Sequence, residues 1–197
     1  MGCNNCKNNP IITLSNSNIS LCKKHFNIYF EKKVRKTIRI YNMVDKTDTF
    51  GVAVSGGKDS MSILYILNKI FKPSKVKLIA LAIDEGIKGY RNPQFIFLKK
   101  FCKENKIKLH TYSFKKEFGK TLDQMKNKSN KIPCTLCGVF RRKIMNDKAL
   151  ELGVKKLATG HNLDDEAQTI LMNQFRKNTR ASAVLGPVTG IVDDPKF

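Results

Sequence analysis

Residues 55–60 have the sequence Ser-Gly-Gly-Lys-Asp-Ser and lie between an apolar run and a helical pattern. The apolar run ends at Val54, and the helical pattern that follows places Met61, Leu64 and Leu67 on one face. A glycine-rich turn between a strand and a helix leaves backbone N–H groups open to an anion, and the positive end of the helix dipole adds attraction. This stretch therefore predicts a binding site for phosphate groups.

The spacing of these residues differs from that of a Walker A phosphate loop. If the Walker pattern began at Gly51, Gly57 would stand where lysine is required, and Asp59 follows Lys58 where serine or threonine is required. The stretch is similar instead to the PP-loop of the N-type ATP pyrophosphatases, which cleave ATP between its α and β phosphates and adenylate a substrate. The alternative is a glycine-rich turn without a ligand.

Two short pairs of metal-binding residue types lie near the N-terminus. Cys3 and Cys6 form a C-x-x-C pair, and Cys22 and His25 form a C-x-x-H pair after a turn-rich loop. Thiolates and imidazole are the ligands of structural Zn²⁺, which orders modules that are too small to have their own core. We therefore predict a zinc module here; the alternative is unrelated thiols in a leader without fixed structure.

A second C-x-x-C pair, Cys134 and Cys137, opens a predicted helix and is followed by Arg141 and Arg142. The helix dipole and the two arginines lower the pKa of thiols at such a position. The pair therefore suits a redox couple, two ligands of a metal cluster or a sulfur-carrying nucleophile, and two inert cysteines remain an alternative. The arginines are either phosphate contacts or ordinary helix surface.

Residues 160–166, Gly-His-Asn-Leu-Asp-Asp-Glu, follow a predicted strand. Asn162 suits the cap of a helix, and acidic residues in the first turn favour the helix dipole. Carboxylates at the end of a strand also suit a Mg²⁺ ion that holds ATP phosphates, or the orientation of a reacting group. We expect this functional role, and we expect His161 to position the loop.

The elements that must place these residues form an α/β fold with a parallel sheet flanked by helices. Apolar or alternating segments predict its strands at residues 50–54, 75–84, 108–114 and 155–159. The loop that follows the second strand, residues 84–91, lies at the carboxyl edge where open α/β sheets bind ligands. Cys102 and His110 are interpreted as structural, and the stretch from residue 178 to 197 reads as loop.

The chain has 197 residues, a net charge of +21 and six cysteines. This charge favours a polyanionic partner such as RNA, although a solvated lysine-rich surface is the alternative. Basic residues also line one face of a predicted helix at residues 28–45, as either an RNA contact or a solvated face. With no apolar membrane span and no signal peptide, we expect a cytoplasmic protein without a membrane partner.

Five stretches together resemble the TtuA/NcsA group of tRNA uridine 2-thiolation enzymes, of the adenine nucleotide alpha-hydrolase-like fold. They are the N-terminal C-x-x-C and C-x-x-H pairs, SGGKDS, DEGIKGYR, PCTLCGVFRR and GHNLDDE. The resemblance extends over nearly the whole chain. It favours three parts: a zinc-binding module at 1–28, a basic linker helix at 29–48 and a PP-loop catalytic domain at 49–197.

The resemblance also implies the residues of the site. Those that would bind ATP are Ala53, Val54, Ser55, Gly57, Lys58, Asp59, Ser60, Ile83, Gly160 and Asp165. Those with catalytic roles would be Cys134, Cys137, Asp59, Asp165 and Arg141, with Mg²⁺ assisting adenylation. The two cysteines would also be ligands of a [4Fe-4S] cluster. The family's third cluster cysteine and second zinc module are absent from these residues, so a C-terminally truncated chain is expected.

The implied reaction is 2-thiouridine synthesis in tRNA, in which ATP adenylates the C2 oxygen of a uridine and sulfur then replaces that oxygen. The resemblance implies sulfide or a ubiquitin-like thiocarboxylate carrier as the sulfur donor, and a homodimer. Two alternatives remain open at this point. One is a PP-loop ligase that adds an amine to tRNA and needs no cysteine pair, and the other is a non-catalytic zinc scaffold that binds RNA.

Overall fold

The structure, a computed structural model, describes residues 2–89, 92–126, 133–183 and 185–186. The chain divides into two compact units, Met1–Met43 and Val44–Phe197, which are described one at a time. The division into parts at 1–28, 29–48 and 49–197 stays a prediction. Within the described ranges, none of the helices has both the length and the apolar character needed to cross a membrane.

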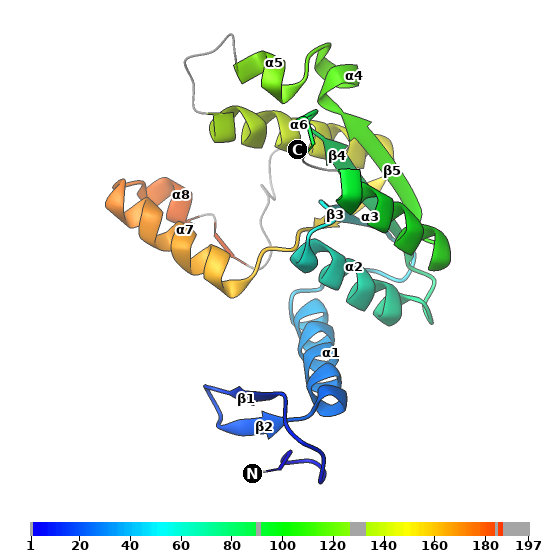
Figure 1. Cartoon of the computed structure of the whole chain (residues 1–197), viewed down its shortest axis with the longest axis vertical. Coiled ribbons are helices and arrows are strands. Elements are labelled where there is room, and N and C mark those ends of the chain that lie inside the picture. The colour runs from blue at the N-terminus through cyan, green and yellow to red at the C-terminus, as the bar shows by residue number, and fades with distance from the viewer. Residues whose placement is uncertain (1, 90–91, 127–132, 184, 187–197) are drawn as a thin grey trace. The chain divides into compact units, whose positions relative to one another are not determined.

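The first unit consists of a hairpin and one long helix (Figure 1). Strands β1, Ile12–Leu14, and β2, Ile19–Leu21, pair antiparallel, with Ile12 opposite Leu21. Helix α1, Lys23–Ile40, follows directly; it begins and ends five residues earlier than the helix predicted at 28–45, and it has no buried residue. The sequence predicts a turn-rich loop in place of the hairpin, since strands this short show almost no periodicity.

The second unit is built on the predicted parallel sheet, with strand order β5-β4-β3-β6. The strands are β3, Thr49–Val54; β4, Lys77–Asp84; β5, Lys108–Ser113; and β6, Val154–Ala158. All three neighbouring pairs run parallel, which confirms the expected α/β class. Because parallel strands share one direction, the loops after β3, β4 and β6 all begin at the same edge of the sheet.

Three long helices contact this sheet: α2, Lys58–Phe71; α3, Asn92–Glu104; and α6, Pro133–Glu151. A fourth long helix, α7, Leu163–Phe175, has no buried residue. The short ones are α4, Phe114–Phe118; α5, Leu122–Lys126; and α8, Thr179–Ala183. Helix α8 corrects the prediction of loop from residue 178 onward, because Asn178 accepts a hydrogen bond from the N–H of Ala181 and starts a further helical turn. Residues 187–197 of that prediction lie outside the described part.

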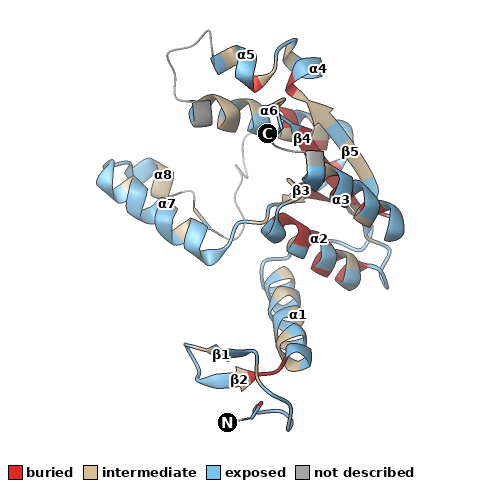
Figure 2. Cartoon of the chain, in the orientation of Figure 1, coloured by how far each residue is buried: buried red, intermediate tan, exposed pale blue. Residues whose placement is uncertain are grey.

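The core lies along β4, which is coloured as buried in Figure 2. Alternate residues of this strand, Ile79, Leu81 and Ile83, belong to clusters with Ala149 and Ile144 of α6. Alternation is the period of a strand, so one face of β4 packs against α6 along most of its length. This packing places the first turns of α6 at the carboxyl end of β4, where the candidate site begins.

Candidate functional site

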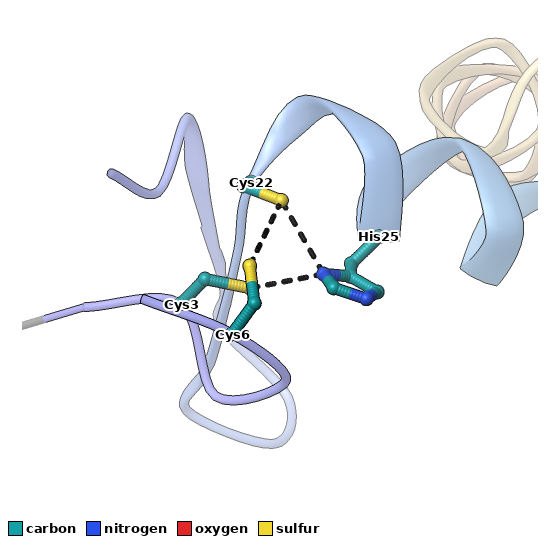
Figure 3. A group of neighbouring side chains, drawn as sticks. All are labelled: Cys3, Cys6, Cys22 and His25. Atoms are coloured by element: carbon teal, nitrogen blue, oxygen red, sulfur yellow. Dashed lines mark hydrogen bonds between the residues drawn. The ribbon is translucent and has the colours of Figure 1, made fainter. Parts of the chain in front are cut away.

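In the first unit, Cys3, Cys6, Cys22 and His25 bring their ligand atoms together, and all four lie within 4.8 Å of one another. Figure 3 shows the three sulfurs and the Nδ1 atom of the imidazole facing a common centre. The Sγ atoms of Cys6 and Cys22 are 3.7 Å apart, and His25 Nδ1 lies 3.4 Å from Cys3 Sγ and 3.3 Å from Cys22 Sγ.

These distances fit one tetrahedral metal ion. Two sulfurs that each bind Zn²⁺ at its usual bond length are separated by about 3.8 Å, close to the observed spacing. The hairpin supplies the alignment, because Leu21 of β2 packs with Cys3 and Cys22, and His25 lies in the first turn of α1. All four donors belong to this unit, so the set is closed and leaves no ligand position for a substrate.

The thiols of this set influence each other. Burial raises the pKa of Cys3, but hydrogen bonds from the backbone of Cys22 and Asn5 and from neighbouring side chains outweigh it and lower the pKa to about 6. For Cys6, a backbone hydrogen bond from Asn8 lowers the pKa, but burial and the adjacent thiols raise it above its ordinary value. One thiolate therefore disfavours the ionisation of a neighbouring thiol. A bound divalent metal ion would offset this repulsion, because metals bind the thiolate form.

In the second unit, residues 55–60 form the predicted turn between β3 and α2. Ser60 is buried and holds the turn together: its hydroxyl donates to the carbonyl of Gly57 at 3.0 Å and accepts from the N–H of Ser55 at 3.2 Å. Gly57 is the N-cap of α2, and Lys58 and Asp59 are exposed in its first turn. The turn therefore presents the start of a 14-residue helix to solvent, as an anion site requires.

The loop after β6 lies against this turn. A Cβ atom added to Gly160 would meet the backbone N of Ser60 at 2.8 Å and its Cα at 2.9 Å, so the two backbones touch. Lys58 donates to both carboxylate oxygens of Asp59, at 2.8 and 2.9 Å. This contact, together with the negative charges of Asp59, Asp165 and Asp164, raises the pKa of Lys58. The structure thus brings together the lysine and the acidic residues that the sequence singles out.

Asp165 is already engaged in the helix start. Its Oδ2 accepts from the N–H of Asn162 at 2.9 Å, and its own N–H donates to Asn162 Oδ1 at 3.1 Å, which makes a capping box. His161 Nδ1 lies 3.0 Å from Thr159 Oγ1, in keeping with its predicted role in positioning the loop. The cap explains part of the acidic cluster and fixes the carboxylates at the edge where the phosphate turn lies.

Cys137 lies near the same edge of the sheet. It is half-buried on α6 and packs against a cluster that contains Ile83 of β4. Cys134 begins the same helix, and its side chain lies outside the described part of the structure. Of the residues expected to bind ATP, Ala53 is half-buried near the end of β3, whereas the side chains of Val54 and Ile83 are buried in the core. Val54 and Ile83 can therefore contact a nucleotide only through their backbone atoms.

Glu85 is a site residue that the sequence interpretation missed. It follows β4 directly, its side chain is 1% exposed, and its Oε1 lies 3.6 Å from the guanidinium of Arg141 on α6. Arg141 itself is exposed to solvent over part of its surface. The available signal was an acidic residue next to a buried strand, within the loop at the carboxyl edge of the sheet, since buried acids need a charged partner.

Comparisons with known proteins agree with this arrangement. The protein-family model of the PP-loop domain matches residues 27–186 of the sequence. A probable sulfurtransferase of Methanocaldococcus jannaschii is 40% identical over 89% of this chain and 53% of its own length. The tRNA-5-methyluridine(54) 2-sulfurtransferase of Pyrococcus horikoshii is 38% identical over 95% of this chain and 59% of its own length.

Among solved structures, the U34-tRNA thiolase NcsA of Methanococcus maripaludis, determined with its [4Fe-4S] cluster, superimposes with a TM-score of 0.83 at 36% identity. That match covers 100% of this chain and 64% of the thiolase. The chain thus spans little more than half the length of the curated relatives above. These matches confirm the resemblance to tRNA 2-thiolation enzymes that the sequence motifs predict. The chain belongs to the PP-loop domain family.

Proposed function

We propose that this chain is the nucleotide-binding and sulfur-transfer part of a tRNA uridine 2-thiolation enzyme. The observation that carries the proposal is the meeting of three features at one edge of the sheet. The phosphate turn touches the loop of Gly160, and α6 packs the half-buried Cys137 against the end of β4. The names of the relatives, one a U34-tRNA thiolase and one a uridine-54 sulfurtransferase, support this activity.

The first step is adenylation. The carbonyl oxygen at C2 of uridine is a poor leaving group, and its attack on the α-phosphate of ATP releases pyrophosphate and converts it into a good one. The N–H groups at the start of α2 and the ammonium of Lys58 stabilise negative charge on the phosphates. Asp59 and Asp165 are the residues that would hold a Mg²⁺ ion, which when bound would offset the negative charge of the phosphates.

Sulfur replacement completes the reaction. Hydrosulfide attacks C2, the C2–oxygen bond to the adenylate breaks, and AMP leaves with that oxygen. We propose Cys134 and Cys137 as two of the ligands of a [4Fe-4S] cluster, which when bound supplies a site that holds and delivers sulfur. Arg141, one helical turn after Cys137, stabilises the charge of the departing AMP. Sulfide, or a ubiquitin-like thiocarboxylate carrier, is the proposed donor.

The first unit has a structural part in this proposal. Zn²⁺ is the metal we assign to Cys3, Cys6, Cys22 and His25, because the donor set and its spacing are those of closed zinc sites. Exposed basic side chains on α1 add a surface for the tRNA backbone: Lys32, Lys33, Arg35, Lys36 and Arg39. A cytoplasmic location and a homodimer belong to the same proposal; a thiolate site favours a reducing compartment.

The test is nucleoside profiling. The full chain, reconstituted anaerobically, is incubated with tRNA, ATP, Mg²⁺ and sulfide, and the digested tRNA is examined by mass spectrometry. We expect 2-thiouridine that depends on ATP and is absent with the Asp59→Asn variant. Unmodified tRNA with no AMP formed would support the RNA-binding scaffold instead, and an amine-containing nucleoside would support a PP-loop ligase. Sedimentation of the same sample measures the oligomeric state.

A further inference from the structure

The ion pair between Glu85 and Arg141 has features that a surface salt bridge lacks. Glu85 is 1% exposed, so nearly all of its hydration is lost on folding. A buried carboxylate is costly unless a positive charge and hydrogen-bond donors compensate it. The guanidinium of Arg141, 3.6 Å away, supplies that charge while part of it still reaches solvent. One side of Arg141 therefore faces a fixed buried anion, and the rest faces outward.

The backbone around Glu85 is held by hydrogen bonds and close packing. Its carbonyl accepts a hydrogen bond from the N–H of Leu122 at 2.8 Å, and the N–H of Gly86 donates to Asp84 Oδ1 at 2.9 Å. Gly86 has φ +73°, and a Cβ atom there would lie 2.6 Å from the side chain of Thr121. This close packing against the segment at the start of α5 fixes where the carboxylate of Glu85 can point.

Arg141 lies on α6 one turn after Cys137, so the two residues are neighbours on the helix surface. Cys137 and Phe140 pack against the cluster of Ile83 and Ile144 beneath this turn. The charge of Glu85 therefore attracts a guanidinium that projects from the same turn of α6 as Cys137. Within the described ranges, Glu85 is the acidic residue that forms an ion pair with Arg141.

We propose that Glu85 is a positioning residue, whose buried carboxylate holds Arg141, and with it the turn of α6 that carries Cys137, against the carboxyl end of the sheet. The inference has two parts. The effect of Glu85 on turnover rests on the proposed function, whereas its effect on the position of the α6 turn applies whether or not the chain thiolates tRNA. Two measurements separate these parts.

The first measurement is a double-mutant cycle on the full chain, with Glu85→Gln, Arg141→Gln and the double variant. The readouts are kcat and KM for ATP in tRNA-dependent AMP formation. If Glu85 acts through Arg141, Glu85→Gln lowers kcat about tenfold with KM for ATP within about twofold, and Arg141→Gln lowers kcat about 100-fold, the loss typical of one charge-stabilising group. The double variant is then no slower than Arg141→Gln alone. If the reductions in kcat of the two single variants multiply in the double variant, or if Glu85→Gln has the kcat of the parent, Glu85 does not act on turnover through Arg141.

The second measurement needs no turnover, tRNA or cluster. The rate at which Cys137 is alkylated in the reduced protein is followed by peptide mass spectrometry. We expect Glu85→Gln to raise this rate about threefold or more, because the turn is no longer held. Lys143→Gln is the matched control, since it breaks an exposed pair with Asp147 on the same helix and should leave the rate unchanged.

The outcomes are distinguishable. A parent protein that forms neither AMP nor 2-thiouridine contradicts the proposed function, whereas the alkylation rate still decides the role of Glu85. An alkylation rate for Glu85→Gln equal to that of the parent overturns the inference. Glu85→Asp keeps the charge on a shorter side chain, and recovery of the parent's rate in that variant supports a charge that holds the turn over a purely packing role.

Discussion

The two units of this chain differ in the surroundings of their cysteines. In the first unit, Cys3, Cys6 and Cys22 converge with His25 into a closed set of four donors. In the second unit, Cys137 lies on α6 beside an apolar cluster, one turn from the exposed and charged Arg141. A closed set of four donors suits a structural metal ion, whereas the cluster that we propose at Cys134 and Cys137 would leave a position where a reactant can bind.

The units also differ in what holds them together. The buried apolar cluster of the first unit is small and includes two cysteines of the proposed metal site, Cys3 and Cys22, with Leu21. The second unit buries most of β3 and β4, with Val52, Ala80 and Leu81 fully removed from solvent. Short modules with so little apolar burial depend on cross-links or metals for stability. The second unit is therefore stabilised mainly by packing, whereas the first unit has the donor set for the metal ion that we propose as its source of stability.

The largest expected effect is on the first unit when the closed set is broken. Cys22→Ser removes one of four donors, and structural zinc sites contribute about 10–16 kcal/mol of apparent binding free energy at pH 7. We expect zinc content to fall from one ion per chain to near zero, and amide hydrogens of residues 2–40 to exchange rapidly while those of β3 and β4 stay protected. Metal analysis and hydrogen exchange measure both effects.

Cys102→Ser is the control for that variant. Cys102 is 2% exposed on α3, where burial raises the pKa of its thiol to about 11, and it has no part in the metal set. This variant should keep its zinc. A Cys22→Ser protein that retains one zinc per chain would contradict the assignment of the closed site.

The next effect concerns packing in the second unit. Leu64 of α2 is fully buried, and Leu64→Ala removes apolar contacts and leaves a cavity, a change that lowers the free energy of unfolding by about 2–5 kcal/mol. Zinc content should not change. Denaturant unfolding followed by circular dichroism measures the loss, and Tyr65→Ala, at a position 55% exposed on the same helix, should cost much less. Equal losses at both positions would mean that α2 does not pack as described.

A smaller effect is expected where the two loops of the nucleotide site touch. Gly160→Ala places a methyl group 2.8 Å from the backbone N of Ser60, and backbone atoms in such contact separate only at a cost of about 1–3 kcal/mol. We expect lower stability and at least tenfold weaker ATP binding by calorimetry. At Gly138 in α6, the nearest atoms are 3.6 Å away on the flexible side chain of Arg142, so Gly138→Ala should be tolerated. ATP binding unchanged in Gly160→Ala would refute the contact.

The smallest effect is the pH dependence of the second unit. The carboxylate of Asp48 is buried, and its Oδ1 lies 2.8 Å from Lys155 Nζ on β6, the compensating charge for an oxygen that has no other hydrogen-bond partner in the described chain. The contact with Lys155, with a backbone hydrogen bond from Asp45, lowers the pKa of Asp48 below its ordinary 3.8.

The direction of that dependence follows from the lowered pKa. The unfolded chain binds a proton at Asp48 more readily than the folded chain, so this pair stabilises the fold above the ordinary carboxyl pKa and loses its effect as pH falls below it. Unfolding midpoints measured between pH 6 and 2 should therefore decline more steeply for the parent than for Asp48→Asn. Parallel curves would rule out this contribution.

Much of the second unit could be predicted from sequence because its strands bury apolar runs. The strand that ends at Val54 and the helix cap at Asn162 both follow local rules that tertiary contacts do not override. The grouping of Cys3, Cys6, Cys22 and His25 could also be predicted, since two short pairs of metal-binding residue types indicate one shared site. In contrast, the hairpin β1–β2 and helix α8 are too short for periodicity to reveal them.

The role proposed for Glu85 could be inferred only from the three-dimensional structure. Its partner Arg141 is 56 positions away in the sequence, as the two residue numbers show, and only the packing of α6 on β4 brings them together. The start of α1 was placed too late for a related reason: Cys22 and His25 begin the helix, and their part in the metal set was not used to locate its first turn. A local sequence pattern does not reveal a contact between residues that are distant in the sequence. It also does not show that a helix begins at residues of a metal-binding set.

The most direct test of the central claim separates adenylation from sulfur transfer in one assay. Pyrophosphate release and 2-thiouridine are measured together for the parent and for Cys137→Ser and Asp59→Asn, with tRNA, ATP and sulfide. The account predicts that Cys137→Ser still releases pyrophosphate but forms no 2-thiouridine, and that Asp59→Asn loses both. A Cys137→Ser protein that forms 2-thiouridine at the parent's rate would contradict it.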